Sequence, residues 1–204
     1  METFRNREYL TARVIRPGDS SQEDPGWETA TPEERINAVW DLTLLCLAWQ
    51  GDQTGELRLQ DLLAEFNAWG VEYLILGAHA LAAHGHVRAT RDLDVWVRPD
   101  AENAKQVLKA LKEFGTPLND LTEADLTRKG TVFQIGLPPL RIDIITAIDG
   151  VGFDEAWSAR LLTRFADLPT AVLSREHLIR NKRATGRTQD LADLEWLETG
   201  EGKR

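Results

Sequence analysis

Three aspartates stand in apolar, strand-like runs, and their spacing suits chemistry on phosphates. Asp92 and Asp94 are one residue apart in DLDVWV, and Asp143 lies within LRIDIIT. Side chains alternate between the faces of a strand, so Asp92 and Asp94 share one face, with Cα atoms about 6.5–7 Å apart. Carboxylates at that distance repel one another and raise each other's pKa. If the second strand lies beside the first, Asp143 joins them on the same face.

A divalent cation would turn this repulsion into binding. Oxygen ligands favour Mg²⁺ or Mn²⁺, and three carboxylates can hold two such ions, as in-line phosphoryl or nucleotidyl transfer requires. An isolated Asp-x-Asp is more often a solvated strand edge or a turn cap, so the pair alone is weak evidence. Gly77 strengthens the metal hypothesis, because a glycine at a strand-to-helix turn lets backbone N–H groups approach a phosphate.

The elements that must position these residues follow from hydrophobic periodicity. The expected core elements are a strand at 71–77, a short helix at 78–85, a strand at 92–97, a helix at 101–115, two strands around the Gly-Leu-Pro-Pro turn within 131–148, and two helices over 174–199 that are broken near Gly186. This order predicts an α+β (mixed α/β) fold, with a small mixed β-sheet core flanked by helices.

The N-terminal quarter is predicted to contain an exposed linker and helices, without strands of the core. Residues 1–30 are rich in Pro, Gly, Ser and acids, which is typical of an exposed linker. Thr31 and Glu34 form a capping box that starts an amphipathic helix ending at Gly51, and another helix is expected over 57–69. The apolar face of the first helix must pack on the core or on a second subunit.

We therefore divide the chain into three parts. These are an N-terminal extension with one amphipathic helix (1–56), a catalytic core (57–150) and a C-terminal helical part of the same domain (151–204).

Composition narrows the class of protein. The net charge is −9 and the pI is about 5.0, which argues against a broad nucleic-acid surface but not against a local basic groove. The longest apolar run, 42–49, is too short to span a membrane, and the N-terminus lacks the apolar core of a signal peptide. We expect a cytoplasmic protein without a membrane partner.

The histidines and tryptophans offer weaker signals. His79 and His84 are five residues apart on a helix, about 140° around it, so a zinc site is disfavoured. His84 is expected to bond locally, and His79 either touches a nucleotide or lies at the surface. Trp96 shares the carboxylate face of its strand and is the candidate for stacking on a ligand.

At this point the sequence resembles a known family. LGAHALAAHGHVRATRDLDVWV is similar to the signature of minimal nucleotidyltransferases of the DNA polymerase β superfamily, and most similar to its AbiEii-like, toxin–antitoxin-related group. The matching positions are Gly77, Ala78, His84, Gly85, Arg88, Thr90, Asp92 and Asp94. Asp143 resembles the third acidic motif, and Lys182, Gly186, Arg187, Asp190, Asp193 and Leu194 resemble the C-terminal motif. The resemblance covers roughly residues 57–199.

The resemblance implies roles for these residues. Asp92 and Asp94 would bind the metal that carries a nucleoside triphosphate, and Asp143 would help to hold a second metal and take the acceptor's proton. The nucleotide-binding set would comprise the Gly77 and Ala78 amides, Arg91, Asp190 and either Lys182 or Arg187. The family has Gly or Ser where this chain has Ala78, which keeps the backbone N–H but offers no hydroxyl.

The implied activity is transfer of an NMP from an NTP to a hydroxyl of a macromolecule, either RNA such as tRNA or a partner protein. The resemblance also implies a toxin–antitoxin component with a cognate partner, and a homo-oligomer is compatible with it. Two alternatives stay open. One is a catalytically weakened nucleotide-binding or partner-binding module, and the other is a small-molecule nucleotidyltransferase of the aminoglycoside type.

Overall fold

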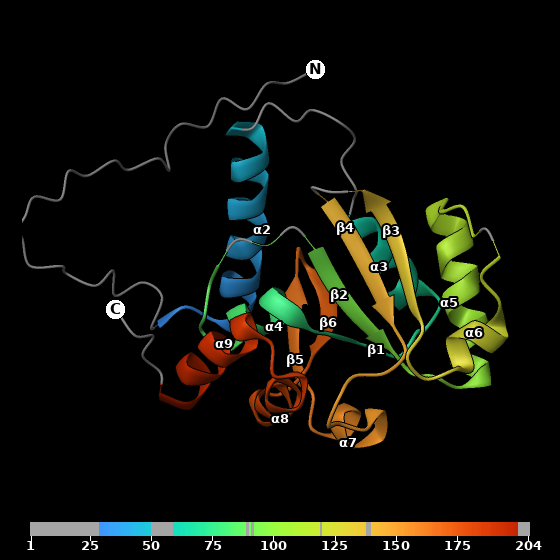
Figure 1. Cartoon of the computed structure of the whole chain (residues 1–204). Coiled ribbons are helices and arrows are strands. Elements are labelled where there is room, and N and C mark those ends of the chain that lie inside the picture. Colours follow the sequence, from blue (N-terminus) through green and yellow to red (C-terminus); the bar gives the residue numbers. More distant parts are fainter. Residues whose placement is uncertain are drawn as a thin grey trace, which may run out of the picture.

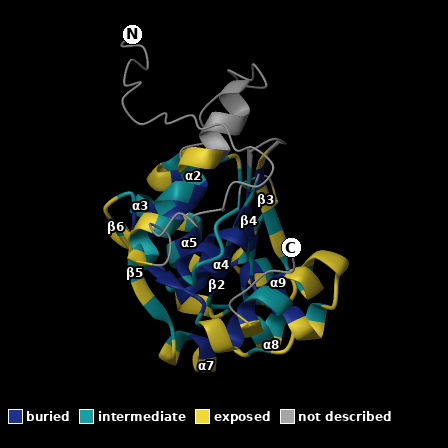
Figure 2. Cartoon of the chain, turned by 90° about the vertical axis from the view of Figure 1, so that its left-hand side faces the viewer, coloured by how far each residue is buried: buried dark blue, intermediate teal, exposed yellow. Residues whose placement is uncertain are grey.

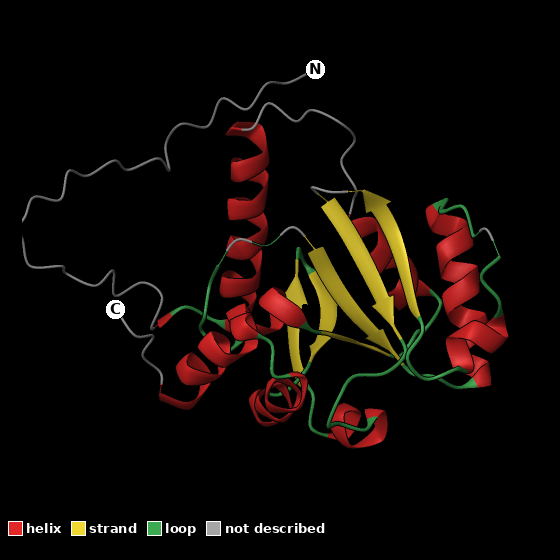
Figure 3. Ribbon diagram, viewed as in Figure 1, coloured by secondary structure: helices red, strands yellow, loops and turns green. Residues whose placement is uncertain are grey.

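The computed structural model describes residues 29–49, 59–88, 90, 92–118, 120–137 and 140–199, and Figures 1 and 3 show its helices and strands. The elements are α2 (Pro32–Trp49), α3 (Leu59–Ala68), β1 (Tyr73–Ile75), α4 (Gly77–Ala83), β2 (Asp92–Val97), α5 (Ala101–Phe114), α6 (Glu123–Thr127), β3 (Val132–Leu137), β4 (Leu140–Ile145), α7 (Phe153–Ser158), β5 (Leu161–Phe165), β6 (Leu168–Val172), α8 (Arg175–Thr185) and α9 (Thr188–Thr199). The linker over 1–28 and Arg91 lie outside the described residues.

One mixed sheet forms the centre of the molecule, with strand order β3-β4-β2-β1-β6-β5. β2 and β4 are parallel neighbours, and their register places Asp94 opposite Asp143. β1 runs antiparallel to β2 on its other side and leads directly into α4. The predicted mixed α/β fold is therefore confirmed, and the third acid lies on the strand next to the first two.

The two faces of the sheet differ in chemistry. Leu93 and Val95 of β2, with Ile142 and Ile144 of β4, are buried in the main hydrophobic cluster, while the intervening acids point to the opposite face. In Figure 1, α3 lies behind the sheet and α5 stands to the right of β3, whereas α4 and α8 lie on the side facing the viewer. Figure 2 shows the buried residues gathered around the strands. Strand alternation thus holds the acids on the side of α4 and α8.

The capping signals of the sequence are confirmed in the structure. The Thr31 and Glu34 pair forms its reciprocal backbone bonds at the start of α2, as predicted. At α5, the Asp100 carboxylate accepts from Asn103 N at 2.8 Å, and Gly115 ends the helix in the left-handed conformation. Of the described helices, none combines the length and apolarity needed to cross a membrane.

Helix α2 packs its apolar face on the core of the same chain, which is one of the two alternatives that the sequence left open. Ile36 and Val39 are buried, and the Trp40 ring meets Phe165 of β5 edge-on at 6.5 Å. The Asn37 amide oxygen accepts from Ala166 N at 3.0 Å, in the turn between β5 and β6. The described part of the extension is thus tied to the sheet edge.

The C-terminal part over 151–204, expected to be helical, also contains two strands. After α7 the chain forms the β5–β6 hairpin, which completes the sheet beside β1. The turn is made by Ala166 and Asp167, both at positive φ (47° and 66°). Hairpin turns of this kind usually carry glycine or asparagine, so the sequence lacked the ordinary signal. The two C-terminal helices, α8 and α9, are confirmed, with Gly186 ending α8 at φ 64°.

Candidate active site

Three carboxylates form one cluster on the sheet face opposite the main hydrophobic cluster. Asp92, Asp94 and Asp143 each place a carboxylate oxygen within 4.8 Å of the other two. Asp143 is buried, while Asp92 and Asp94 are partly exposed. In the described part of the chain this is the only group of three His, Cys, Asp or Glu residues close enough to share a metal ion. The structure thus brings together the three acids that alternation predicted on one face.

Gly77 lies directly against this cluster. It adopts φ +59°, and a Cβ built on it would lie 2.1 Å from Asp94 Oδ2. The preceding residue, Leu76, donates its backbone N–H to the Asp94 carbonyl at 2.9 Å. Because both the conformation and the space exclude a side chain, Gly77 couples the turn between β1 and α4 to the position of Asp94. Ala78 follows at the start of α4 and is buried.

Burial and mutual repulsion disfavour the negative charge of the cluster. Burial raises the pKa of Asp94 to about 6, and the Asp92 and Asp143 carboxylates add to this rise. Arg141 and Lys182 oppose it. In addition, Asp143 Oδ1 is buried without an aligned hydrogen bond. An oxygen-only donor set of this kind fits a hard divalent cation.

Two further residues hold the acids in place. The Thr90 hydroxyl donates to Asp92 Oδ1 at 2.5 Å. On β4, Arg141 donates from Nη2 to Asp143 Oδ2 at 2.9 Å and lies 3.6 Å from Asp92 Oδ2. Sequence reasoning did not single out Arg141, although its position two residues before Asp143 puts it on the acid face by the same alternation.

A second charged cluster joins α8 and α9. Lys182 is buried and donates to Asp190 Oδ1 at 2.9 Å and to Asp193 Oδ2 at 2.6 Å. Arg88, in the segment before β2, approaches Asp193 at 3.5 Å. The structure therefore brings Lys182 and Asp190 together, and adds Asp193 as the more buried partner. Arg187 is exposed in the link between α8 and α9, outside this cluster.

His79 and His84 both contact other elements of the fold. His84 ends α4, but its ring does not bond locally as expected, because Nε2 lies 2.8 Å from the carbonyl of Leu173, which follows β6. The surface alternative for His79 is wrong, because this residue is only 2% exposed and packs edge-on against Phe165 at 5.9 Å. Burial lowers the pKa of His79 to about 4. The ring is therefore neutral at pH 7.

Trp96 does not offer a face to a ligand, contrary to the sequence-based expectation. It is only 2% exposed and meets Phe153 of α7 edge-on at 5.0 Å. A cleft of about 510 Å³ lies here, at the carboxyl ends of β2 and β4, lined in part by Trp96, Thr146 and Phe153. The short helix α7, which the sequence did not reveal, covers the position where a base was expected to stack.

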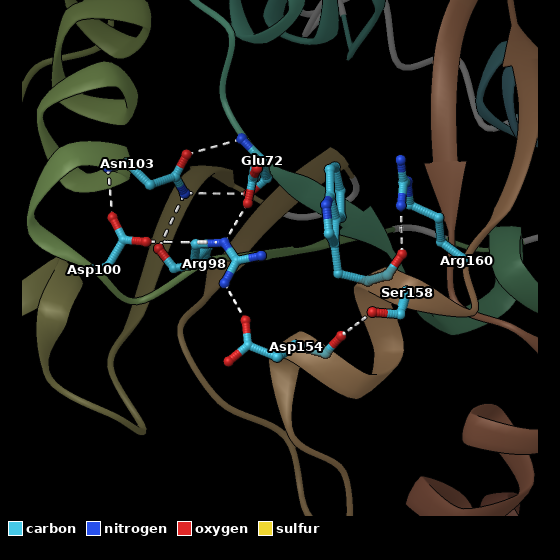
Figure 4. A network of polar contacts seen from close by, with 8 residues as sticks. Glu72, Arg98, Asp100, Asn103, Asp154, Ser158 and Arg160 are labelled. Carbon is cyan, nitrogen blue, oxygen red and sulfur yellow. Dashed lines mark hydrogen bonds and ion pairs between the residues drawn. The ribbon is translucent and has the colours of Figure 1, made fainter.

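The side of this cleft is fixed by a network around Arg98, shown in Figure 4. Arg98 pairs with Glu72 and with Asp154 of α7, and lies 3.8 Å from Asp100 at the start of α5. Its guanidinium also stacks over Phe153, 4.8 Å from the ring centroid. These contacts link α5 and α7 to the end of β2.

Comparison with known proteins gives only distant matches. No protein-family model matches the chain, and no curated protein matches it.

The solved structures that are similar to part of this chain include the following three. A putative nucleotidyltransferase from Thermotoga maritima is 14% identical, covering 69% of this chain and 90% of its own, with a TM-score of 0.47. The antibiotic-resistance factor ANT(2'')-Ia is 15% identical. The match covers 70% of this chain and 81% of that protein, with a TM-score of 0.46. The lincosamide antibiotic adenylyltransferase LnuA, bound to lincomycin, is 17% identical. The match covers 72% of this chain and 99% of that protein, with a TM-score of 0.43. At this level of likeness, function must be argued from the residues of the site.

Proposed function

We propose that the protein is a metal-dependent nucleotidyltransferase, which moves an NMP from an NTP to an acceptor hydroxyl. The observation that carries the proposal is the cluster of Asp92, Asp94 and Asp143, drawn from adjacent parallel strands and packed against the Gly77 turn. A solvated strand edge would not need a glycine with no room for a Cβ beside one of its acids. Nor would it bury Asp143 beside two other carboxylates.

The three acids would hold Mg²⁺ or Mn²⁺. Such an ion supplies positive charge to phosphate oxygens and lowers the pKa of a bound hydroxyl. The pKa of Asp94 is raised to about 6 when no cation is present, so the carboxyl is mostly ionised only above that pH. Near neutral pH the neighbouring carboxylates then repel one another, and a bound cation would relieve this repulsion.

The proposed reaction is an in-line nucleotidyl transfer. The acceptor oxygen attacks the α-phosphorus of the NTP, the bond from that phosphorus to the bridging oxygen breaks, and pyrophosphate leaves. The acceptor's proton passes to a carboxylate, for which Asp143 is our candidate. Gly77 and Ala78 remain the predicted phosphate-binding amides.

Lys182 is assigned a different role from the one its sequence motif suggested. Its ammonium is held by Asp190 and Asp193, so it contributes a fixed charge near Asp94 rather than a mobile phosphate ligand. Arg187, which is exposed, is the freer of the two candidates to reach a triphosphate.

The acceptor is proposed to be a macromolecule, either RNA such as tRNA or a partner protein. The Asp92 side chain is 39% exposed and the neighbouring Arg141 side chain is 34% exposed, so a large acceptor can approach the acids. A place in a toxin–antitoxin pair, with a cognate partner, rests on the sequence resemblance alone.

A second candidate is transfer to a small hydroxyl compound. The cleft beside Trp96 favours it, since its volume of about 510 Å³ falls in the range of small-molecule sites. Asp94 and Trp96 lie on one face of β2, two residues apart. The lining of this cleft includes none of the three acids, so an acceptor bound there would have to extend past Trp96 to reach them.

Labelling with all four [α-³²P]NTPs and Mg²⁺ or Mn²⁺ tests the proposal, using total RNA, total protein and a panel of small hydroxyl compounds as acceptors. Wild type is compared with Asp94→Ala and with Asp120→Ala, which removes an exposed acid elsewhere. We expect labelling by wild type and Asp120→Ala only. Equal labelling by Asp94→Ala would refute the role of the cluster. Nucleotide binding in a calorimeter without labelling of any acceptor would favour a binding module.

A further inference from the structure

Arg141 makes contacts that a simple surface arginine does not make. Its Nη2 donates to Asp143 Oδ2 at 2.9 Å, its Nε forms an ion pair with Asp143 Oδ1 at 2.9 Å, and its Nη2 lies 3.6 Å from Asp92 Oδ2. One guanidinium therefore spans carboxylates from two strands. These are two of the three acids that form the candidate cation site.

We propose that Arg141 is a built-in counter-ion of this site, which holds the carboxylates while no divalent cation is bound and must release Asp143 when one binds. The inference rests on the proposed function, because it takes the three acids as cation ligands. It goes further by assigning a role to a residue that the catalytic roles above leave unused.

The geometry favours competition over cooperation. A cation shared by Asp92 and Asp143 would bind between their carboxylates, and Arg141 Nη2 already contacts an oxygen of each. The guanidinium also faces both oxygens of Asp143 at once. Arginine and a divalent cation would therefore draw on the same oxygens, and their like charges repel at this separation.

The structure also indicates that Arg141 can leave. Asp143 Oδ1 and Arg141 Nε lie 2.9 Å apart but are not aligned as a hydrogen bond. The guanidinium therefore makes only one of the two hydrogen bonds of a bidentate arginine–carboxylate pair. The Arg141 side chain is one third exposed, and water can solvate the guanidinium once it is released. By contrast, Lys182 is buried between two carboxylates and has no comparable exit.

Direct measurement of Mn²⁺ binding tests this inference without any assay of catalysis. Free Mn²⁺ is quantified by electron paramagnetic resonance during titration of wild type, Arg141→Gln, Arg141→Lys and Arg128→Gln at about pH 7.5, well above the raised pKa of Asp94. Arg128 is the matched control, because its side chain is exposed and only contacts Asp125 loosely at 4.0 Å. Circular dichroism confirms that each variant is folded.

We expect Arg141→Gln to bind Mn²⁺ at least about tenfold more tightly than wild type, because one positive charge next to the ion is removed. Arg141→Lys should change the affinity less, and Arg128→Gln should match wild type. Unchanged or weaker binding by Arg141→Gln, with wild type binding normally, would overturn the counter-ion role and leave the metal site intact. If no folded variant binds Mn²⁺, both the inference and the proposed metal site fail.

Discussion

Gly77 and Asp94 are in such close contact that the glycine has no room for a side chain. A Cβ on Gly77 would lie 2.1 Å from Asp94 Oδ2, and the residue sits at φ +59°. The turn that ends β1 and the acid in the middle of β2 are therefore one structural unit. Any change at this turn must move a carboxylate of the candidate cation site.

The substitution Gly77→Ala is expected to destabilise the fold and weaken Mn²⁺ binding together. The left-handed backbone alone costs about 1–2 kcal/mol, and displacement of Asp94 adds to it. Gly115→Ala is the matched control, because Gly115 also has positive φ but nothing within 4 Å of its Cβ position. Urea unfolding and Mn²⁺ titration of both variants measure the difference. Equal effects of the two substitutions would contradict the coupling of Gly77 to Asp94.

Asp94 should make the metal-free protein less stable as pH rises from about 4 to about 6. Its pKa is raised from 3.8 to about 6 in the fold, so the unfolded chain loses this proton first, and the folded state is penalised above that range. Asp92 and Asp143 face Asp94 and strengthen the effect, whereas Arg141 and Lys182 reduce it.

The comparison of wild type with Asp94→Asn isolates this effect from the other titrating groups. Thermal unfolding from about pH 4.5 to about pH 7.5 should show the variant gaining stability relative to wild type as pH rises. Added Mg²⁺ should close the gap at the upper end of this range. A gap that stays constant with pH would show that the fold does not perturb Asp94.

Removing the Lys182 ammonium should be strongly destabilising. Lys182→Met leaves Asp190 and Asp193 without their central partner, and breaking a buried ion pair in this way costs about 3–5 kcal/mol. On the same helix, Arg183 pairs with Glu198 at the surface, so Arg183→Met should cost less than about 1 kcal/mol. Chemical denaturation of the two variants measures the loss in the free energy of unfolding. Similar losses for both variants would mean that the Lys182 cluster is solvated.

His79→Leu should leave stability nearly unchanged. Both ring nitrogens of His79 are buried without a hydrogen-bond partner in the described structure, so an apolar side chain of similar size removes no such bond. The expected change in the free energy of unfolding is within about 1 kcal/mol. A loss well above this value in urea unfolding would show that the ring nitrogens are bonded in solution.

The features set by local patterns could be predicted from the sequence. Alternation in DLDVWV and LRIDIIT placed Asp92, Asp94 and Asp143 on one face, and Gly77 was recognised as a special position. The capping box at Thr31 and the glycines that end α5 and α8 gave helix boundaries close to those observed.

The features that depend on tertiary contacts could not be predicted. The β5–β6 hairpin turns on Ala166 and Asp167 instead of a glycine, and α7 has only six residues, too few for a clear period. Strand alternation alone predicts an open face for Trp96, whereas Phe153 of α7 packs against its ring. The double pairing of Lys182 joins two helices whose packing the sequence does not specify.

The central claim is that the Asp92, Asp94 and Asp143 cluster transfers a nucleotidyl group, and the position of the label tests it most directly. Parallel reactions contain [α-³²P]NTP or [γ-³²P]NTP with the acceptor identified in the screen. We predict that wild type attaches the α-label and releases labelled pyrophosphate from the γ-labelled NTP, and that Asp143→Asn loses both activities. Attachment of the γ-label to the acceptor, or full α-label transfer by Asp143→Asn, would contradict this claim.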